Sequence, residues 1–357
     1  MSNNIQDHFK ITFLEVLRTP LYAALVLIMS FYAVSVYFTS IAIGETARAE
    51  LFGYIGLAFK IGQIFLCGYL ITKALYIMII VRPKKLARTI IDDYKANIFN
   101  LKSILNALPI MLLFPIFFSA FTSFKSLIPE IIPFSYDPLF IKADQFIHGG
   151  FHPYQLLMPF LGFGVITFIF ACVYKIWFFA KFAVLYWQAF SFSNPALRSQ
   201  FFLTCILSWI INGSMFALLF SSAGPCFFHL IFPDQSNPFE PLMSYLHETD
   251  LSFSVWALNS QEYLWNNFTS NNTAHLSGIS AFPSMHVSMA FIFLLVSTHY
   301  HRAVFAGFLV FFMFILIGSV FLGWHYAVDG YFAILTTWLI WVFSGRMTKK
   351  LALDKPR

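Results

Sequence analysis

Two histidines and one aspartate stand out in the last quarter of the chain because they interrupt an otherwise apolar sequence. His286 ends the motif FPSMH, and His325 and Asp329 are the first and last residues of a later motif, HYAVD. An imidazole can act as nucleophile, acid or base near neutral pH. A carboxylate beside it fixes its tautomer and raises its basicity. These residue types therefore point to nucleophilic and acid–base catalysis, provided that the fold brings them together.

The elements needed to position His286 can be read from its neighbours. Pro283 and Ser284 indicate the start of a helix, because proline is tolerated in a first turn and serine accepts hydrogen bonds from the free amides there. The apolar runs 283–300 and 303–323 are each long enough to cross a hydrocarbon core of ~30 Å at ~1.5 Å per residue. Two consecutive spans return the chain to the face that it left.

This return predicts that both histidines lie at the same membrane surface. Asp329 follows His325 by four positions, so a helical segment would place their side chains on one face. The alternative reading is structural: a lone histidine at a span end is commonly an interface residue, and His325 with Asp329 would form a helix-end ion pair. The convergence of all three groups at one surface favours a catalytic site.

The composition is that of a polytopic membrane protein. Hydrophobic residues make up 59% of the chain and charged residues only 11%, against about a quarter in soluble domains. The net charge of +6 is interpreted as a consequence of topology, since no basic stripe with interleaved aromatic residues indicates nucleic acid binding. The four cysteines are scattered without metal, redox or disulfide spacing.

The apolar runs predict an all-α bundle of about eight transmembrane helices. These spans are 20–43, 51–81, 104–124, 163–190, 201–221, 283–300, 303–323 and 326–345. The proline-rich stretch 125–160 is expected to be an irregular surface or re-entrant piece. We divide the chain into N-terminal transmembrane helices with an interfacial segment (1–160), a catalytic membrane domain (161–345) and a basic cytoplasmic tail (346–357).

The distribution of lysine and arginine predicts the orientation. With eight spans, fifteen of these 22 residues fall in loops on the side of the two termini, four fall on the other side and three fall within spans. Because basic loops stay in the cytoplasm, His286, His325 and Asp329 are expected to face the periplasm, the cell exterior or an organelle lumen. A bacterial inner membrane is the favoured location.

The two motifs also carry a family resemblance. FPSMH followed some forty residues later by HYAVD resembles the type 2 phosphatidic acid phosphatase superfamily, whose patterns are PSGH and SRxxxxxHxxxD. The match is nearer to the branch that contains fungal inositol phosphorylceramide synthase, with PSxH and HYxxD. The resemblance covers roughly residues 200–345 and implies that the superfamily's six-helix core lies in the C-terminal part.

The resemblance also implies a role for each residue. The histidine that matches His325 attacks phosphorus and forms a phosphohistidine, and the aspartate that matches Asp329 orients and activates it. The histidine that matches His286 protonates the departing oxygen and then serves as base for the acceptor. No metal and no cofactor is expected.

Two basic motifs of the superfamily are missing from the chain. Gly318 and Ser319 stand where the phosphatases have Ser-Arg, and the segment 222–225 (SAGP) occupies the place comparable to KxxxxxxRP. Phosphate or headgroup contacts are therefore expected from other residues, namely Ser284, Ser280, Lys175, Gln261 and Tyr263. Ser284 could be only a helix cap, and Tyr263 only part of an aromatic interface belt. Lys181 is expected to snorkel towards the cytoplasm, whereas Lys175 lies deeper and remains open between snorkelling and function.

These observations predict an integral membrane lipid phosphotransferase. It would move a phosphoryl or phospho-alcohol headgroup, phosphoinositol among the candidates, between membrane lipids. One alternative is a lipid phosphate phosphatase, with water as the acceptor. An alternative from another class is a transporter with a His/Asp proton relay, although the ionisable residues cluster at one surface. The sequence does not name a protein partner.

Overall fold

The computed structural model describes residues 16–97, 100–270, 278–351 and 353, and all regular elements in these ranges are helical. The longer helices are α2 (Pro20–Ala42), α3 (Gly53–Tyr76), α4 (Leu86–Asn97), α5 (Leu101–Ile131), α6 (Asp137–Ile147), α7 (Pro153–Leu161), α8 (Gly164–Ala189), α9 (Pro195–Ile210), α12 (Glu240–Asp250), α13 (Trp256–Thr269), α14 (Met285–Ser297), α15 (Arg302–Phe321) and α16 (Ala327–Lys350). Shorter pieces are η1 (Thr46–Arg48), η2 (Ile77–Val81), η3 (Ile211–Phe216), α10 (Ala217–Leu219), η4 (Pro225–Phe227) and α11 (Phe228–Ile231).

Seven helical stretches of the described chain are long and apolar enough to cross a membrane. They contain α2, α3, α5, α8, α9, α15 and α16. The all-α, multi-pass architecture is thus confirmed, whereas the predicted number of eight spans is not. The expected span 283–300 is the 13-residue helix α14, whose length of ~20 Å at 1.5 Å per residue is less than a hydrocarbon core.

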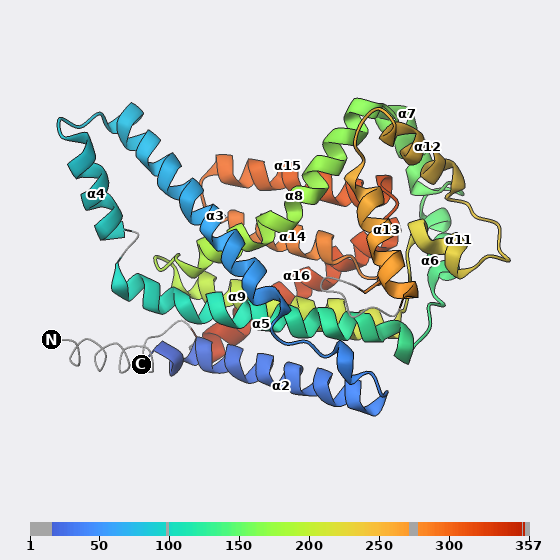
Figure 1. Ribbon diagram of the computed structural model, residues 1–357, viewed down its shortest axis with the longest axis horizontal. Helices are drawn as coiled ribbons and strands as arrows, with labels where there is room; N and C mark the ends of the chain where they lie inside the picture. The colour runs from blue at the N-terminus through green and yellow to red at the C-terminus, as the bar shows by residue number, and fades with distance from the viewer. Residues whose placement is uncertain (1–15, 98–99, 271–277, 352, 354–357) are drawn as a thin grey trace.

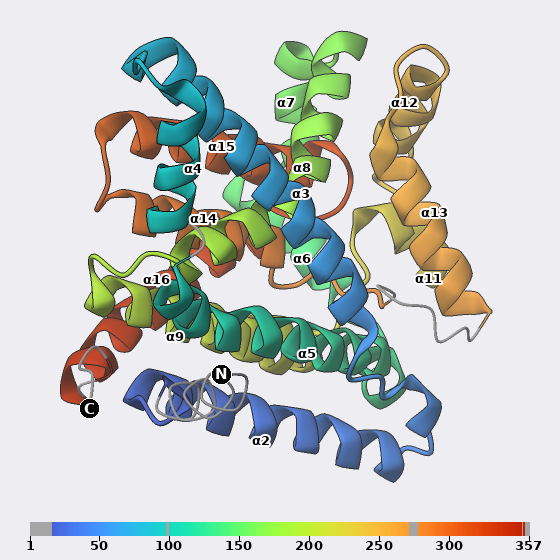
Figure 2. The same cartoon turned by 60° about the vertical axis from the view of Figure 1, so that its left-hand side comes forward.

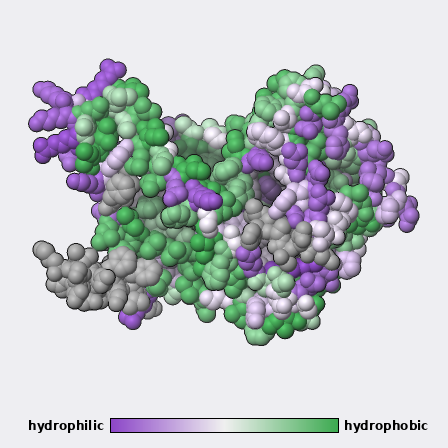
Figure 3. All heavy atoms as spheres, viewed as in Figure 1, coloured by the Kyte–Doolittle hydropathy of each residue, from purple (hydrophilic) through white to green (hydrophobic). Residues whose placement is uncertain are grey.

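The long helices run between two ends of the molecule (Figure 1). The start of α2, helix α4 and the end of α16 lie at one end, on the left of that view, and α6, α7, α11, α12 and α13 lie at the other. Hydrophilic side chains gather at both ends, with a hydrophobic zone between them (Figure 3). This is the surface expected of a bundle with its middle in lipid.

Helix α14 lies at the centre of the bundle. It packs against α8, α9, α15 and α16, and Val287, Ile292 and Phe293 along its length are completely buried. A helix that is apolar on every side is surrounded by protein or by lipid, and α14 is surrounded mainly by protein. The N-terminus of α14, where His286 lies, is thereby fixed relative to four neighbouring helices.

Most of the stretch 125–160 is helical, so the expectation of an irregular segment is wrong, whereas its predicted surface or re-entrant position stays a prediction. Helix α5 continues to Ile131 although Pro109, Pro115 and Pro129 lie within it. Prolines are tolerated in membrane helices when neighbouring groups satisfy the backbone carbonyls that they leave free. Other prolines of this stretch begin α6 and α7, where the missing N–H costs nothing.

A buried arginine connects the N-terminal helices to the rest of the bundle. Arg198 of α9 donates to the hydroxyl of Tyr22 in α2 and to the backbone carbonyls of Asn106, Gln188 and Ala189. The last two carbonyls are at the C-terminus of α8, where such acceptors lack helical partners. Figure 2 shows α2 lying along α5 and α9, the arrangement that these bonds hold together.

Three of the four basic residues that we counted on the side opposite the termini lie within α-helices. Lys60 is in α3, Lys125 in α5 and Lys142 in α6. Helix α16 extends to Lys350, so the segment 346–357 begins as its last turn, and residues 354–357 lie outside the described residues. The orientation of the bundle and the division of the chain at residue 160 stay predictions.

The topology can be tested with two exposed positions at opposite ends of the molecule. In a chain whose four native cysteines are replaced by serine, Lys84→Cys should react with a membrane-impermeant maleimide only from the cytoplasmic side. Asp234→Cys, in the turn after α11, should react only from the other side. Both side chains are exposed, so a failure to label would not reflect burial. Labelling of both positions from one side would contradict the assignment.

Candidate active site

His325 lies in the turn that joins α15 to α16. Its backbone N–H and that of Trp324 both donate to the carbonyl of Ser319, at 2.9 and 3.0 Å. The turn passes through Gly323 at φ +73°, a conformation that L-residues rarely adopt. The Ser319 side chain, at the position of the superfamily's arginine, donates its hydroxyl to the carbonyl of Leu316. The turn therefore presents the imidazole without a neighbouring guanidinium.

The predicted pairing of His325 with Asp329 is present in the structure. The imidazole Nδ1 lies 3.2 Å from Oδ2 of Asp329, and the same oxygen accepts the backbone N–H of Tyr326 at 3.1 Å. Both side chains are buried. A carboxylate accepts, so Nδ1 carries the proton, and Nε2 keeps the lone pair that a nucleophile needs.

His286 is held at the start of α14 by aromatic rings. Ser284 caps this helix by accepting the backbone N–H of Val287 at 3.3 Å. The His286 ring stacks on Tyr174, with 4.6 Å between ring centroids, and lies 4.0 Å from the ring of Trp177. The Trp177 indole also donates to the His286 carbonyl at 3.0 Å. Helix α8 thus fixes both the backbone and the ring of this histidine.

The two motifs come together as predicted. The ring centroids of His286 and His325 are 6.1 Å apart. The backbone N–H of Ser284 donates to the carbonyl of Asp329 at 3.3 Å, which connects the start of α14 to the start of α16.

Two aspartates of α6 hold the loops around this pair, and the sequence analysis did not single them out. Asp144 accepts the backbone N–H groups of Ala327 and Val328 at 2.8 and 2.9 Å. These are free amides at the N-terminus of α16, a place where a phosphate would otherwise be favourable. Because a carboxylate already occupies them, the phosphate has to be bound elsewhere.

Asp137 holds the segment that stands in place of the superfamily's basic motif. Its carboxylate accepts from the Ser222 hydroxyl, from the backbone N–H groups of Ala223 and Gly224, and from the Tyr326 hydroxyl. A Cβ at Gly224 would lie 2.7 Å from the carbonyl oxygen of Trp324, the residue before His325. The segment 222–225 therefore supports the turn of His325 by close backbone packing.

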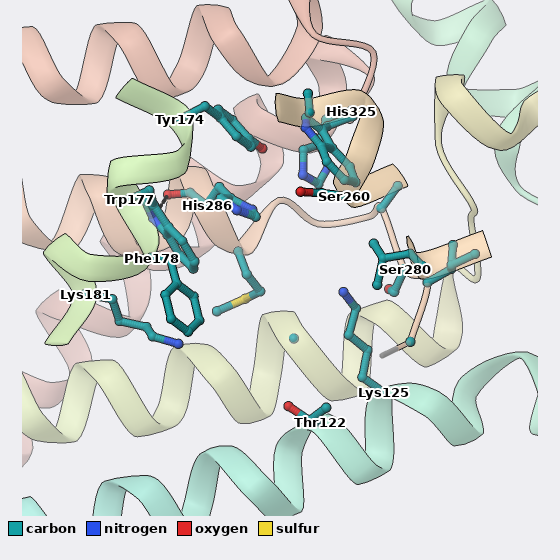
Figure 4. Close-up of a pocket in the computed structure, with 18 of the residues that line it drawn as sticks. Thr122, Lys125, Tyr174, Trp177, Phe178, Lys181, Ser260, Ser280, His286 and His325 are labelled. Carbon is teal, nitrogen blue, oxygen red and sulfur yellow. Dashed lines mark hydrogen bonds between the residues drawn. The ribbon is translucent and has the colours of Figure 1, made fainter. Parts of the chain in front are cut away.

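Both histidines open into one cavity of about 600 Å³ (Figure 4). Most of its walls are aromatic and aliphatic, with a small number of polar groups, as in ligand pockets generally. Among the residues with polar groups that line it are Lys125, Lys181, Ser280, Tyr174 and Trp324.

Two lysines contribute positive charge to this cavity. Lys125 extends from α5 with its ammonium towards the histidines (Figure 4). Lys181 of α8 is only 3% exposed and its ammonium lies among aromatic rings, so the expectation that it snorkels to the cytoplasm is wrong. Lys175 also borders the cavity, but its side chain is exposed and its ammonium lies 5.7 Å from the Trp256 ring.

Two buried hydrogen-bond donors beside the histidines have no partner among the residues that the structure describes. They are the hydroxyl of Tyr174 and the indole N–H of Trp324. The Tyr174 hydroxyl points towards His325 (Figure 4). An unpaired buried donor costs about 1–3 kcal/mol, so these groups are suited to an acceptor that enters the cavity.

Of the other residues expected to bind a headgroup, some line the cavity and some are buried in the structure around it. Ser280 and Tyr263 line the cavity. Ser284 is completely buried as the helix cap. Gln261 is also buried, and its amide donates to the carbonyl of Leu322 at 3.0 Å, so it supports the turn before His325.

The surroundings keep His325 uncharged. Burial lowers the pKa of its imidazole to about 3, and the nearby charge of Lys125 adds to the lowering, while the backbone of Ala281 opposes it. A neutral imidazole at physiological pH is the nucleophilic form. Among the described residues, no three His, Cys, Asp or Glu side chains gather as ligands of a metal ion.

A comparison with protein families matches residues 140–343, more than half of the chain, to the model described as PAP2 superfamily. No match was found among curated proteins or among solved structures.

The lowered pKa of His325 predicts an acid-sensitive stability. Unfolded histidine titrates near pH 6.5, so below this pH the unfolded chain binds a proton that the folded chain excludes, and stability falls by up to ~1.4 kcal/mol per pH unit. In detergent, the melting temperature should therefore fall between pH 6.5 and 4.5 less steeply for His325→Asn than for the unmodified protein. The exposed His299, changed to Asn, is the matched control. Parallel curves for all three proteins would contradict a neutral, buried His325.

Proposed function

The chain belongs to the PAP2 superfamily, and on that premise we propose that it transfers the phosphorus-containing headgroup of a lipid through a covalent intermediate on His325. The observation that carries the proposal is the pair of imidazoles at one end of the cavity, with Asp329 on Nδ1 of His325. This is the arrangement of a nucleophile with its orienting carboxylate and a separate acid–base group.

In the first step, Nε2 of His325 attacks phosphorus and the bond to the leaving alcohol oxygen breaks. His286 gives a proton to that oxygen, and the alcohol departs. Burial, with the neighbouring His325 and Lys125, lowers the pKa of His286, so its protonated form depends on the negative charge of the bound lipid. In the second step, the acceptor hydroxyl loses its proton to His286 and attacks the phosphohistidine, and the P–N bond breaks. Asp329 stabilises the positive charge that develops on His325, as the carboxylate of a Ser-His-Asp triad does.

The phosphate oxygens need donors where negative charge develops. Lys125 and the unpaired Tyr174 hydroxyl and Trp324 indole N–H lie beside the histidines. We propose that these three groups replace the two missing basic motifs.

The favoured acceptor is the hydroxyl of a second lipid, because the cavity walls are mainly apolar. Phosphoinositol is one headgroup to test, and water as acceptor would make the protein a lipid phosphatase. We further propose that the reaction takes place at the exoplasmic face. A proton-relay transporter is less favoured because the hydrogen bonds of Asp329 lead to Tyr326 and α6, at one end of the molecule.

The two histidines should differ in how they respond to the donor. His325→Ala should abolish both turnover and covalent labelling, and Asp329→Asn should resemble it because the attacking tautomer is lost. His286→Ala should lower turnover of a lipid donor by ~10²–10⁴-fold. A nitrophenyl phosphate ester should be much less affected, since its leaving group needs no proton.

The measurement is trapping of labelled enzyme by acid and base quench, run beside turnover of both donors with and without an acceptor lipid. Label on the unmodified enzyme should be acid-labile and base-stable, as a phosphoramidate is. Labelling that persists in His325→Ala but disappears in His286→Ala would reverse the two roles.

We also expect activity to be independent of metal ions, because imidazole and carboxylate supply the nucleophile and the proton transfers. Turnover of the purified protein should survive incubation with EDTA. Loss of activity with EDTA and its recovery with a single divalent ion would count against the histidine mechanism. A metal-dependent phosphatase assayed in parallel confirms that chelation is complete.

A further inference from the structure

Lys181 is a buried lysine that has no role in the proposed reaction. Its ammonium lies among six aromatic rings at 4.3–5.6 Å from their centroids, those of Tyr54, Phe118, Trp177, Phe178, Phe182 and Trp209. Within the described residues, this ammonium makes no ion pair or hydrogen bond. Aromatic faces attract a cation, but they leave its three N–H donors without strong acceptors.

An unpaired charge in this place is costly. Removal of an ammonium from water costs several kcal/mol unless a counter-charge and hydrogen bonds replace the water. Cation–π contacts return part of that, at about 2 kcal/mol or somewhat more for a desolvated site. A further partner for the charged amine has to enter the cavity that Lys181 lines, and a bound anion would supply it. An ionisable residue within a membrane span is also, by default, a candidate functional group.

Lys181 is separated from the groups that would hold the reacting phosphate. The Trp177 indole lies between, 4.0 Å from the His286 ring and 5.6 Å from the Lys181 ammonium. Lys125 approaches the histidines from another side of the cavity (Figure 4). A phosphate on His325 and Lys125 would therefore leave the Lys181 ammonium for a second group.

Small residues in the cavity wall allow neighbouring side chains to pack closely. Gly213 lies in the π-helical piece η3, and a Cβ there would lie 2.7 Å from the Phe121 ring and 3.2 Å from the Met285 sulfur. Gly213 and Ala217 both line the cavity. π-Helical segments are frequent at functional sites, and η3 places Gly213 in this wall, whereas Ala217 belongs to α10.

We propose that Lys181 anchors a second anionic subsite, which binds an acidic group carried by the headgroup of the same lipid whose phosphorus is attacked. The inference rests on the proposed function for the identity of the reacting phosphate. It specifies the substrate class: a phospholipid whose headgroup bears a carboxylate or a second phosphate a few bonds from the reacting phosphorus.

Phosphatidylserine and phosphatidylethanolamine are suitable probes, because they differ by a single carboxylate and share the ammonium and the phosphodiester. Binding of each radiolabelled lipid is measured in mixed micelles with the His325→Ala protein, so that turnover does not interfere. This protein should bind phosphatidylserine at least tenfold more tightly. Adding Lys181→Met should bring the ratio of the two affinities to within about twofold, whereas Lys181→Arg should keep the preference.

Three further lysine variants control for general electrostatic attraction. Lys125→Met should weaken both lipids and keep their ratio. Lys60→Met, an exposed lysine of α3, should change neither. If Lys175→Met, and not Lys181→Met, removes the preference, the acidic group binds at the cavity rim and the proposal is wrong.

Equal binding of the two lipids by the starting protein, or a preference that survives Lys181→Met, would also overturn the second subsite. If Lys181→Met does not fold, Lys181→Gln takes its place, and folding is judged by the melting temperature. The proposed function fails separately: a protein that shows the Lys181-dependent preference but never forms a covalent phosphoenzyme retains the subsite and loses the phosphohistidine mechanism.

Discussion

Hydrogen bonds from backbone N–H groups to buried carboxylates are the interaction on which the site depends. Asp137, Asp144 and Asp329 each accept at least one backbone amide, and these amides belong to the loops that carry or support His325. A buried carboxylate is tolerated when such donors surround it. Because the bonds are directional and several meet at each carboxylate, the turn before α16 has one arrangement, and the imidazole has one orientation.

The apolar surroundings that make these hydrogen bonds to the carboxylates necessary also determine the chemistry of the site. A dry site weakens the charged form of an imidazole and strengthens every interaction with an incoming anion. The neutral His325, the unpaired donors of Tyr174 and Trp324, and the buried ammonium of Lys181 are consequences of one environment. Together, these groups suit a substrate that carries negative charge.

The parts of the site that could be predicted from the sequence are those encoded by local spacing. The return of two consecutive apolar runs predicted that His286 and His325 would meet, and the four-residue spacing predicted the contact with Asp329. The charged groups that come from other helices could not be predicted in this way. Lys125 was missed because it lies in the proline-rich stretch 125–160, into which α5 continues. Asp144 was missed because its partners are 183 and 184 residues away.

Lys181 is different, since a signal for it was present. Tyr174, Trp177 and Lys181 recur at spacings of three and four along α8, so they share a face, and Lys175 lies off it. We had compared Lys175 and Lys181 by their depth in the span. The face of the helix on which each lysine lies distinguishes the two better. The length of α14 also escaped prediction, because an apolar run does not reveal whether lipid or protein will surround it.

The reach of the N-terminal helices into the cavity has a consequence for shortened versions of the chain. The family match begins at residue 140, yet Lys125, Phe118 and Tyr54 contribute to the cavity from α5 and α3. The Arg198 guanidinium also has two of its four acceptors in residues before that point. A fragment confined to the matched region would keep His286, His325 and Asp329 and lose one wall of the cavity beside them. The cavity is therefore a property of the whole bundle. A chimeric protein that is meant to carry its specificity would need α3 and α5 as well as the matched region.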